Sequence, residues 1–143
     1  MSASTDVDAT VEQLLRDYDT ITVVGASEAP AKPAHYVPEH MQSRGWRIVP
    51  VNPRGGTILG ERAYESLADV PGPVGLVQVF RRSEQTPDVA REAVAAGATA
   101  LWLQLGIASA EARQIAQEAG LRYVEDRCML VEQRRTGLRA PAR

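Results

Sequence analysis

The chain has 143 residues, of which 44% are apolar and 24% charged, and its formal net charge is -2. This length supplies one ordinary domain, and the composition excludes collagen, a disulfide scaffold and intrinsic disorder. The near-neutral charge excludes a global attraction to nucleic acid or to an anionic membrane. A single cysteine excludes an intrachain disulfide, and neither a secretory signal nor an apolar run of roughly 20 residues is present, so a cytoplasmic protein is expected.

Strand-like and helical patterns alternate along the chain. Strands are predicted where β-branched or apolar runs stop at turn residues, as at Gly25, and helices where apolar residues recur at helical spacing. Pro33 fits the first turn of the second helix, and Asp6 or Asp8 is available to cap the first. The expected elements, in chain order, are a polar leader at residues 1–5, a helix that ends near Asp17, a strand at 20–24, a helix at 34–44, a strand at 46–51, a long loop at 52–60, a helical turn at 66–70, a strand at 74–80, a helix at 86–96, a strand at 100–103, a helix at 109–119 and a strand at 123–125.

This alternation predicts an α/β fold. We expect a single Rossmann-like, doubly wound parallel sheet of about five strands, in the order 3-2-1-4-5, with helices on both faces. The domain should extend over residues 1–135, and residues 136–143 should form a polar, frayed C-terminal tail.

Ligands of open parallel sheets bind beyond the carboxyl ends of the strands, so the segment after the first strand is the first candidate site. Gly25 allows a sharp turn there, and the amides of Ala26 and Ser27 near a helix start suit a phosphate. The alternative is that Gly25 only ends the strand and Ser27 only caps a helix. The run reads Gly-Ala-Ser-Glu-Ala-Pro and lacks the Gly-x-Gly-x-x-Gly pattern, so the motif does not support a standard dinucleotide.

The ends of the second and third strands narrow the ligand class. NAD-binding folds usually place an acidic residue after the second strand, but this chain has Asn52, Pro53 and Arg54 there. A guanidinium suits a phosphorylated ribose, as in NADP or coenzyme A, unless the segment is only a turn with a solvated charge. After the third strand, Phe80 and Arg81 can bracket an adenine, or Phe80 can belong to the core.

Together these segments resemble the small CoA-binding domain proteins, whose fold is like that of the N-terminal CoA-binding domain of the succinyl-CoA synthetase α subunit. The resemblance covers about residues 20–132 and is carried by Val-Val-Gly-Ala-Ser27, Lys-Pro-Ala-His-Tyr-Val-Pro38, Val-Pro-Val-Asn-Pro-Arg54, Val-Phe-Arg81, Leu-Trp-Leu-Gln-Leu-Gly-Ile107 and Val-Glu-Asp-Arg-Cys-Met-Leu-Val131. It implies that the pyrophosphate lies on the first turn, the phosphorylated ribose near residues 52–54, the adenine near 79–81 and the pantetheine toward 104–107. The cofactor-binding residues that it implies are Gly25, Ala26, Ser27, Lys32, Pro33, Asn52, Pro53, Arg54, Val79, Phe80, Arg81, Gln104, Gly106 and Ile107.

The expected function is non-catalytic binding of coenzyme A or an acyl-CoA. The further domains of the synthetases are not present in this sequence, and neither His35 nor His40 has an evident partner, so no catalytic residue and no metal ligand is assigned. Two alternatives stay open: an NADP-binding oxidoreductase or redox sensor, and a protein-interaction domain that has lost ligand binding.

The expected partners are the small-molecule ligand CoA and either a second copy of the chain or an unknown protein, with no nucleic acid and no membrane. Trp46 and Trp102 can form a dimer surface, although burial in the sheet explains both equally well. Cys128, beside Arg127, can form a mixed disulfide with the coenzyme thiol, or it can be a buried and inert cysteine.

Overall fold

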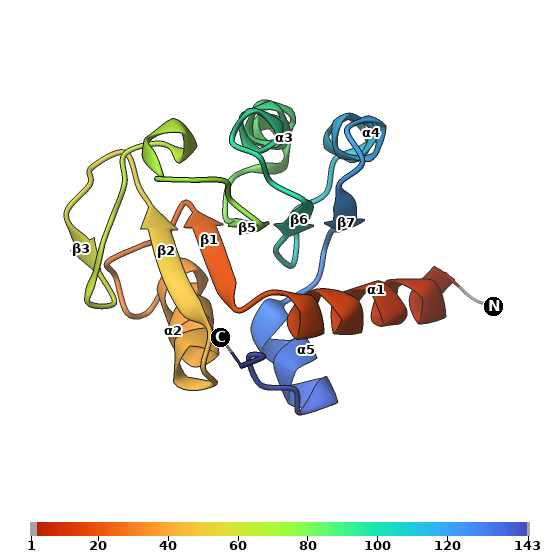
Figure 1. The fold of residues 1–143 in the computed structure, drawn as a ribbon, viewed down its shortest axis with the longest axis horizontal. Coiled ribbons are helices and arrows are strands. Elements are labelled where there is room, and N and C mark those ends of the chain that lie inside the picture. Colours follow the sequence, from red (N-terminus) through yellow and green to blue (C-terminus); the bar gives the residue numbers. More distant parts are fainter. Residues whose placement is uncertain (1–2, 143) are drawn as a thin grey trace.

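A computed structural model describes residues 3–142, with side chains described from Asp6 onward. Five parallel strands form one sheet with helices on both faces, and two short antiparallel strands form a separate hairpin (Figure 1). This confirms the predicted α/β, Rossmann-like fold. The sheet contains β1 (Thr20–Val24), β2 (Arg47–Val51), β5 (Leu76–Val79), β6 (Ala100–Leu103) and β7 (Arg122–Val124), and the hairpin contains β3 (Thr57–Ile58) and β4 (Glu61–Arg62). The helices are α1 (Ala3–Asp17), α2 (Pro33–Ser43), α3 (Thr86–Ala95), α4 (Ala110–Glu118) and α5 (Met129–Thr136), with the short 3-10 helices η1 (Leu67–Asp69) and η2 (Ser83–Gln85).

Local sequence signals explain most element boundaries. Pro33 occupies the first turn of α2, where a missing N–H costs nothing, and the Ser109 side chain caps α4 by accepting the Ala112 amide at 3.1 Å. The first helix begins at Ala3 rather than near Asp6, so residues 3–5 of the predicted polar leader are helical, while residues 1–2 lie outside the described part of the chain.

The predicted strand order is wrong. The observed order is β2-β1-β5-β6-β7, or 2-1-3-4-5 when the five strands are counted along the chain. On the outer side of β2, the oxygen of Pro50 accepts the Tyr64 amide at 3.0 Å. The N–H and C=O of one strand residue point to the same side, so the N–H that Pro50 lacks would also face outward. A further strand on the outer side of β2 would find no N–H donor at Pro50. Strand β2 therefore stays at the edge of the sheet, and β5 pairs with β1.

The core is divided by the sheet into two layers (Figure 1). Helices α1, α2 and α5 cover one face, and α3 and α4 cover part of the other. Trp46 and Trp102 both belong to the first layer, and their indole N–H groups donate to the backbone oxygens of Tyr18 and Arg127 at 2.7 and 2.8 Å. Burial in the core therefore accounts for both tryptophans.

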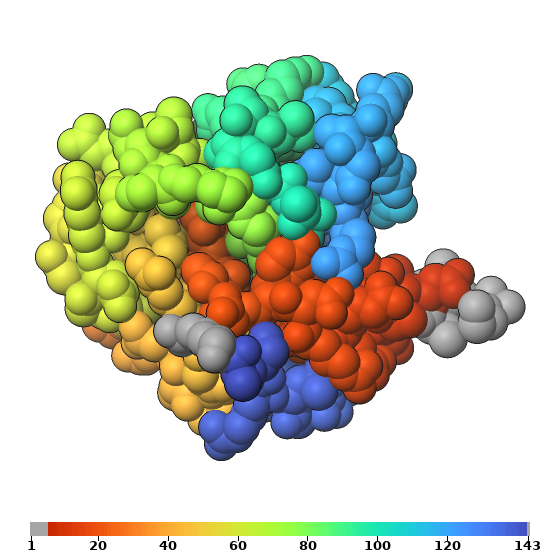
Figure 2. Space-filling model, in the orientation of Figure 1, coloured from red at the N-terminus to blue at the C-terminus, as the bar shows by residue number. Residues whose placement is uncertain are grey.

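The C-terminal region is more ordered than the sequence suggested. Helix α5 was not predicted, because its mostly polar sequence has little helical periodicity. Contacts with α1 support it, including the ion pair of Arg135 with Asp8 at 3.8 Å (Figure 2). Beyond it, Leu138 and Ala140 pack against the core, and the Ala140 amide donates to the oxygen of Arg44 at 3.2 Å. The expectation of fraying is thus wrong for residues 136–140, whereas Arg143 lies outside the described residues.

Among the described residues, the helices are all too short or too polar to cross a membrane.

Candidate functional site

The predicted site segments meet at one edge of the sheet. Residues 25–27, 52–54, 80–82 and 104–107 follow the carboxyl ends of β1, β2, β5 and β6, which are parallel neighbours. Helix α2 leaves β1 on one face of the sheet and α3 leaves β5 on the other (Figure 1). The boundary between β1 and β5 is therefore the switch point at which open α/β sheets bind ligands.

Gly25 is required by the fold itself. Its φ is +88°, and a Cβ atom at this position would lie 2.4 Å from the backbone oxygen of Phe80. The Phe80 amide donates to the oxygen of Val24 at 2.8 Å, so the Phe80 backbone cannot easily move away from residue 25. The close packing of β1 against the end of β5 is thus sufficient to explain why residue 25 is a glycine, and no ligand is needed for this explanation.

The turn after β1 leaves some of its backbone donors without an acceptor in the described residues. The Ser27 amide donates to the Ala34 oxygen at 3.2 Å, and the Ser27 hydroxyl accepts the Ala29 amide at 3.0 Å, so both groups stabilise the approach to α2. The Ala26 amide, in contrast, has no acceptor among the residues that the structure describes. The expectation of a free amide therefore fits Ala26 but not Ser27.

Asn52 connects this turn to the turn after β2. Its Nδ2 donates to the Ala26 oxygen at 2.8 Å, and its Oδ1 accepts the Arg54 amide at 2.8 Å. The Gly55 amide closes the turn on the Asn52 oxygen at 2.8 Å, with Pro53 and Arg54 between them. This geometry fixes the backbone of Arg54 next to the turn after β1, and the Arg54 side chain is exposed.

Three cations around the crevice lack anionic partners. Lys32 and Arg54 are exposed and Arg81 is half-buried, and none of them is within ion-pair distance of a carboxylate in the described part of the chain. Unpaired cations and free backbone amides are donors to which phosphate binds. Elsewhere the arginines with carboxylate partners include Arg91, Arg113, Arg122, Arg127 and Arg135.

A cavity of about 310 Å³ opens in the crevice on the α3 side. Pro53 and Arg81 line it, but the Phe80 side chain packs into the opposite core layer and Val79 is fully buried. Successive residues of an extended chain point to opposite faces, so Phe80 and Arg81 do not bracket one ring in this structure. The remaining lining residues are Val24, Val51, Glu65, Ser66, Leu67, Gln85, Asp88, Val89 and Glu92.

The segment after β6 is held through Gln104 by Gln78 and Met129, neither of which was predicted as a site residue. Gln104 Oε1 accepts the Met129 amide at 3.3 Å and Gln78 Nε2 at 3.2 Å, so its side-chain amide has one fixed orientation. Gln78 is fully buried, and its own Oε1 has no partner in the described residues. The signal that was missed is a glutamine inside the apolar run of β5.

Asp126 was missed as well. Its Oδ1 accepts the Gly106 amide at 2.7 Å, and its φ of 57° is unusual for a residue other than glycine. The Ile107 amide donates to the oxygen of Gln104 at 2.9 Å, so the amides of both Gly106 and Ile107 are used within the protein. This role of Asp126 can be recognised only from the geometry of the loop.

The loops after β6 and β7 are also joined through Tyr123. Its hydroxyl donates to Glu125 at 2.8 Å, and Glu125 accepts the Ser109 amide at 3.4 Å. Burial raises the pKa of the Tyr123 phenol well above its usual range, and the hydrogen bond to Glu125 adds to this effect.

The histidines and the cysteine lie in the layer of α2 and α5. His40 Nε2 is hydrogen-bonded to Gln133 Oε1 at 2.6 Å, while His35 Nδ1 is buried and has no partner among the described residues. Cys128 is half-buried at the start of α5 and packs against the core. Within residues 3–142, no group of three or more His, Cys, Asp or Glu side chains is arranged to hold a metal ion.

A doubly wound parallel sheet, with a free backbone amide and unpaired cations at its switch point, is the architecture of nucleotide-binding α/β proteins. More specifically, this chain belongs to the CoA binding domain family, whose sequence pattern matches residues 19–134.

Several proteins are similar to this chain in sequence or in structure. The uncharacterized protein YneT of Bacillus subtilis (strain 168) is 40% identical over 123 residues, which are 86% of this chain and 91% of the relative. A hypothetical protein from Pyrococcus horikoshii OT3 has a structure with a TM-score of 0.85 at 34% identity, covering 90% of each chain. The dinucleotide-forming acetyl-coenzyme A synthetase 1 of Ca. Korarchaeum cryptofilum shares the fold, with a TM-score of 0.68 at 22% identity over 81% of this chain and 28% of that chain.

Proposed function

We propose that this protein binds coenzyme A, free or acylated, at the carboxyl ends of β1, β2, β5 and β6 without transforming it. The observation that carries the proposal is the set of unpaired cations Lys32, Arg54 and Arg81, in the segments after β1, β2 and β5, together with the Ala26 amide, which has no acceptor in the described residues. Phosphates are recognised by such donors, and coenzyme A carries a pyrophosphate and a ribose phosphate that need several of them. Membership of the CoA binding domain family selects this nucleotide over others.

Each part of the coenzyme has a counterpart in the crevice. We assign the pyrophosphate to the Ala26 amide and Lys32, at the turn that Gly25 and Ser27 shape and from which Pro33 begins α2. The ribose phosphate is assigned to Arg54.

The adenine is assigned to the cavity between Pro53 and Arg81, whose Val24, Val51 and Val89 side chains supply apolar contact. Val79 and Phe80 support this site from the core.

The pantetheine arm is assigned to the Gln104 side chain. Its oxygen is already occupied by two protein donors, which leaves the Nε2 protons for a carbonyl of the arm. Gly106 and Ile107 then shape the loop, because their amides are used within the protein.

Binding without catalysis fits the donors at this edge. The cations and amides of this edge are groups that hold phosphate, while the cavity also presents the carboxylates of Glu65, Asp88 and Glu92. The Ser66 hydroxyl donates to Asp69 at 3.0 Å, with no histidine of the described chain bonded to this pair. The Ser27 hydroxyl accepts the Ala29 amide. His40, near the C-terminal end of α2, is hydrogen-bonded to Gln133 of α5.

A thermal-shift panel with CoA, acetyl-CoA, NADP, NAD and ATP tests the proposal. A ligand present at 100 times its dissociation constant adds about 2.7 kcal/mol to the free energy of unfolding, so binding gives a clear rise in Tm. We expect this rise with CoA and acetyl-CoA. A rise with NADP alone would replace the proposal by the oxidoreductase alternative, and no rise with any ligand would favour an interaction domain.

Arg54→Ala tests the assignment of the ribose phosphate. The variant should lose more affinity for CoA than for dephospho-CoA in isothermal titration calorimetry, because only CoA carries the 3′-phosphate. Arg134→Ala removes the same charge from an exposed position of α5 and should leave both affinities unchanged. Equal losses for the two ligands in Arg54→Ala would remove Arg54 from this role.

A further inference from the structure

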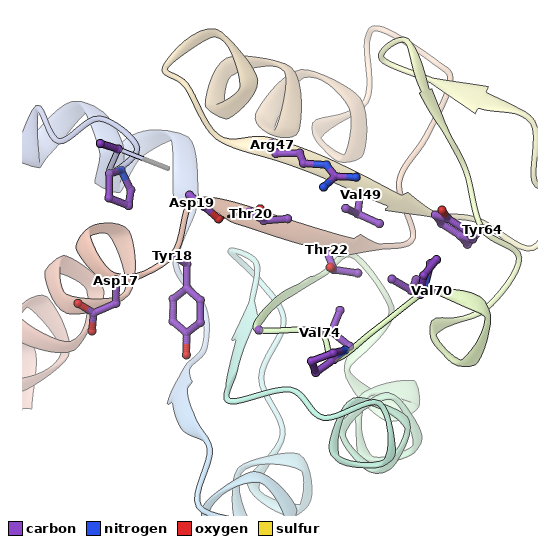
Figure 3. A pocket seen from close by; sticks show the side chains of 15 residues that line it. Asp17, Tyr18, Asp19, Thr20, Thr22, Arg47, Val49, Tyr64, Val70 and Val74 are labelled. Atoms are coloured by element: carbon purple, nitrogen blue, oxygen red, sulfur yellow. Dashed lines mark hydrogen bonds between the residues drawn. The ribbon is translucent and has the colours of Figure 1, made fainter.

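The free thiol of Cys128 lies at the nucleotide edge of the sheet. Residues 125–128 follow the carboxyl end of β7 and lead directly into α5, so they share this edge with the segments after β1, β2, β5 and β6. A cavity of about 660 Å³ lies at the opposite edge, where Thr20, Arg47 and Gly75 mark the amino ends of β1, β2 and β5 (Figure 3). A ligand in that cavity is separated from Cys128 by the length of the strands, whereas a coenzyme at the nucleotide edge is not.

The segment to which we assign the pantetheine arm is hydrogen-bonded to the start of α5. Gln104 Oε1 accepts the amide of Met129, the residue after Cys128, at 3.3 Å, and the Gly106 amide donates to Asp126 at 2.7 Å. Covalent bonds of about 1.3 and 1.5 Å separate the Met129 nitrogen from the Cys128 Cα, so this Cα lies within roughly 6 Å of Gln104 Oε1. An arm that contacts Gln104 therefore ends close to Cys128, and the end of the arm is where coenzyme A carries its sulfur.

A buried acceptor at the same place lacks a donor. Gln78 is fully buried, and its Nε2 donates to Gln104 Oε1 at 3.2 Å, but its own Oε1 has no partner in the described residues. Gln78 pairs with Trp102 of β6, and Gln104 follows Trp102 by two residues, so the Gln78 side chain points toward the nucleotide edge. A buried oxygen without a donor destabilises a fold. The amide N–H groups of a pantetheine arm are donors of the kind that this oxygen lacks.

The position of Cys128 at the start of α5 suits a reactive thiol. The residue is half-buried, has an extended backbone, and its side chain makes no capping hydrogen bond to the helix. The first N–H groups of a helix stabilise negative charge, and the thiolate is the attacking species in thiol–disulfide exchange. Arg127 is not available for this purpose, because its guanidinium donates to Asp8 at 2.8 Å and to Glu132 at 3.2 Å. The helix start is therefore the feature that favours the reaction.

We propose that Cys128 forms a reversible mixed disulfide with coenzyme A, an inference that rests on the proposed coenzyme binding. The reaction partner is the symmetrical disulfide of coenzyme A, one half of which occupies the site. The Cys128 thiolate attacks the nearer sulfur, a bond between Cys128 Sγ and that sulfur forms, the original S–S bond breaks, and the other half leaves as the thiolate of free coenzyme A. Cys128 is oxidised and the disulfide is reduced, so no other oxidant is needed. The step is a stoichiometric attachment, and an excess of free coenzyme A reverses it.

Intact-mass spectrometry of the full chain, mixed with the disulfide of coenzyme A, measures the exchange. Because the sequence contains one cysteine, a dithiothreitol-sensitive adduct identifies Cys128 as its site. We expect one coenzyme per chain. The exchange should be at least about tenfold faster than with oxidised glutathione at equal concentration, because binding raises the effective concentration of the disulfide beside the thiol. Acetyl-CoA, which has no free thiol, should slow the exchange by occupying the same site.

A thiol moved to a distant exposed position is the matched control. In the double variant Cys128→Ser with Ser43→Cys, the thiol lies at the C-terminal end of α2, away from the nucleotide edge. Its exchange rates with the two disulfides should agree within about twofold, because no bound coenzyme lies beside it. Arg54→Ala, in the chain that keeps Cys128, should slow exchange with the disulfide of coenzyme A and leave exchange with oxidised glutathione unchanged.

Two results would overturn the mixed disulfide and leave coenzyme binding intact. They are equal exchange rates of the wild type with both disulfides, and no exchange with either, each observed while CoA still raises the Tm of Cys128→Ser. Absence of the rise in Tm with CoA in both the wild type and Cys128→Ser would instead contradict the proposed function, and the mixed disulfide with it.

Discussion

The side-chain amide of Asn52 donates to the backbone oxygen of Ala26 at 2.8 Å, while its oxygen accepts the Arg54 amide at the same distance. One residue thus holds the turn after β1 and the turn after β2 in a fixed relation. Both hydrogen-bonding ends of its side chain have partners within the protein. We therefore assign Asn52 the role of positioning the Ala26 amide and Arg54 for a phosphorylated ligand.

Asn52→Asp tests this positioning role. The variant keeps the acceptor for the Arg54 amide but replaces the donor by a carboxylate beside the Ala26 oxygen, so stability should fall by about 1–3 kcal/mol in urea denaturation. CoA affinity should fall further than in Asn52→Ala, because the added negative charge faces the phosphates. Unchanged CoA binding in both variants would contradict the role.

Gly25→Ala measures how strongly the fold needs a glycine after β1. The new Cβ would lie 2.4 Å from the Phe80 oxygen at a φ of +88°, and we expect a loss of about 3 kcal/mol in denaturant titration. Gly120→Ala is the matched control, because Gly120 has a φ of +81° and a Cβ atom added there would meet nothing within 4 Å. The control should lose about 1 kcal/mol from backbone strain alone, and similar losses at both positions would contradict the importance of the contact with Phe80.

Tyr123 should make stability depend on alkaline pH. Burial raises the pKa of its phenol above the ordinary value of 10.0, so the folded protein keeps a proton that the unfolded chain releases. Its contribution is therefore complete below about pH 10 and is lost as pH rises above that value. Tyr123→Phe should flatten this alkaline decline in unfolding free energy, whereas Tyr36→Phe, at an exposed position, should not. Parallel pH curves for wild type and Tyr123→Phe would contradict the assignment.

Asp126 should stabilise the loop after β6 through its side chain. Asp126→Ala loses the bond to the Gly106 amide and places alanine at a φ of 57°, so we expect a loss of about 2 kcal/mol. Asp126→Asn keeps an acceptor and tolerates this backbone conformation, and it should stay within about 0.5 kcal/mol of wild type. Differential scanning calorimetry distinguishes the two, and equal losses would show that the carboxylate charge matters rather than the geometry.

Strand alternation and turn residues were sufficient to predict the class of fold and the edge at which the candidate site lies. Runs such as residues 20–24 before Gly25 and 100–103 are local signals, because β-branched and apolar side chains favour a buried strand whatever lies beside it. Parallel strands then bring residues 25–27, 52–54, 80–82 and 104–107 to one edge.

Tertiary structure decided which groups at that edge are available. Whether an amide is free depends on acceptors that are distant in the sequence or set by the turn, and so the Ser27 amide is used while the Ala26 amide is not. The strand order, the separation of Phe80 from Arg81 and the helix at Met129–Thr136 likewise depend on packing between distant segments. The sequence by itself thus determined the fold class and predicted a phosphate-binding turn after β1. Which backbone amides of this turn lack an acceptor was decided only by the tertiary structure, because folding determines which acceptors lie close to each amide.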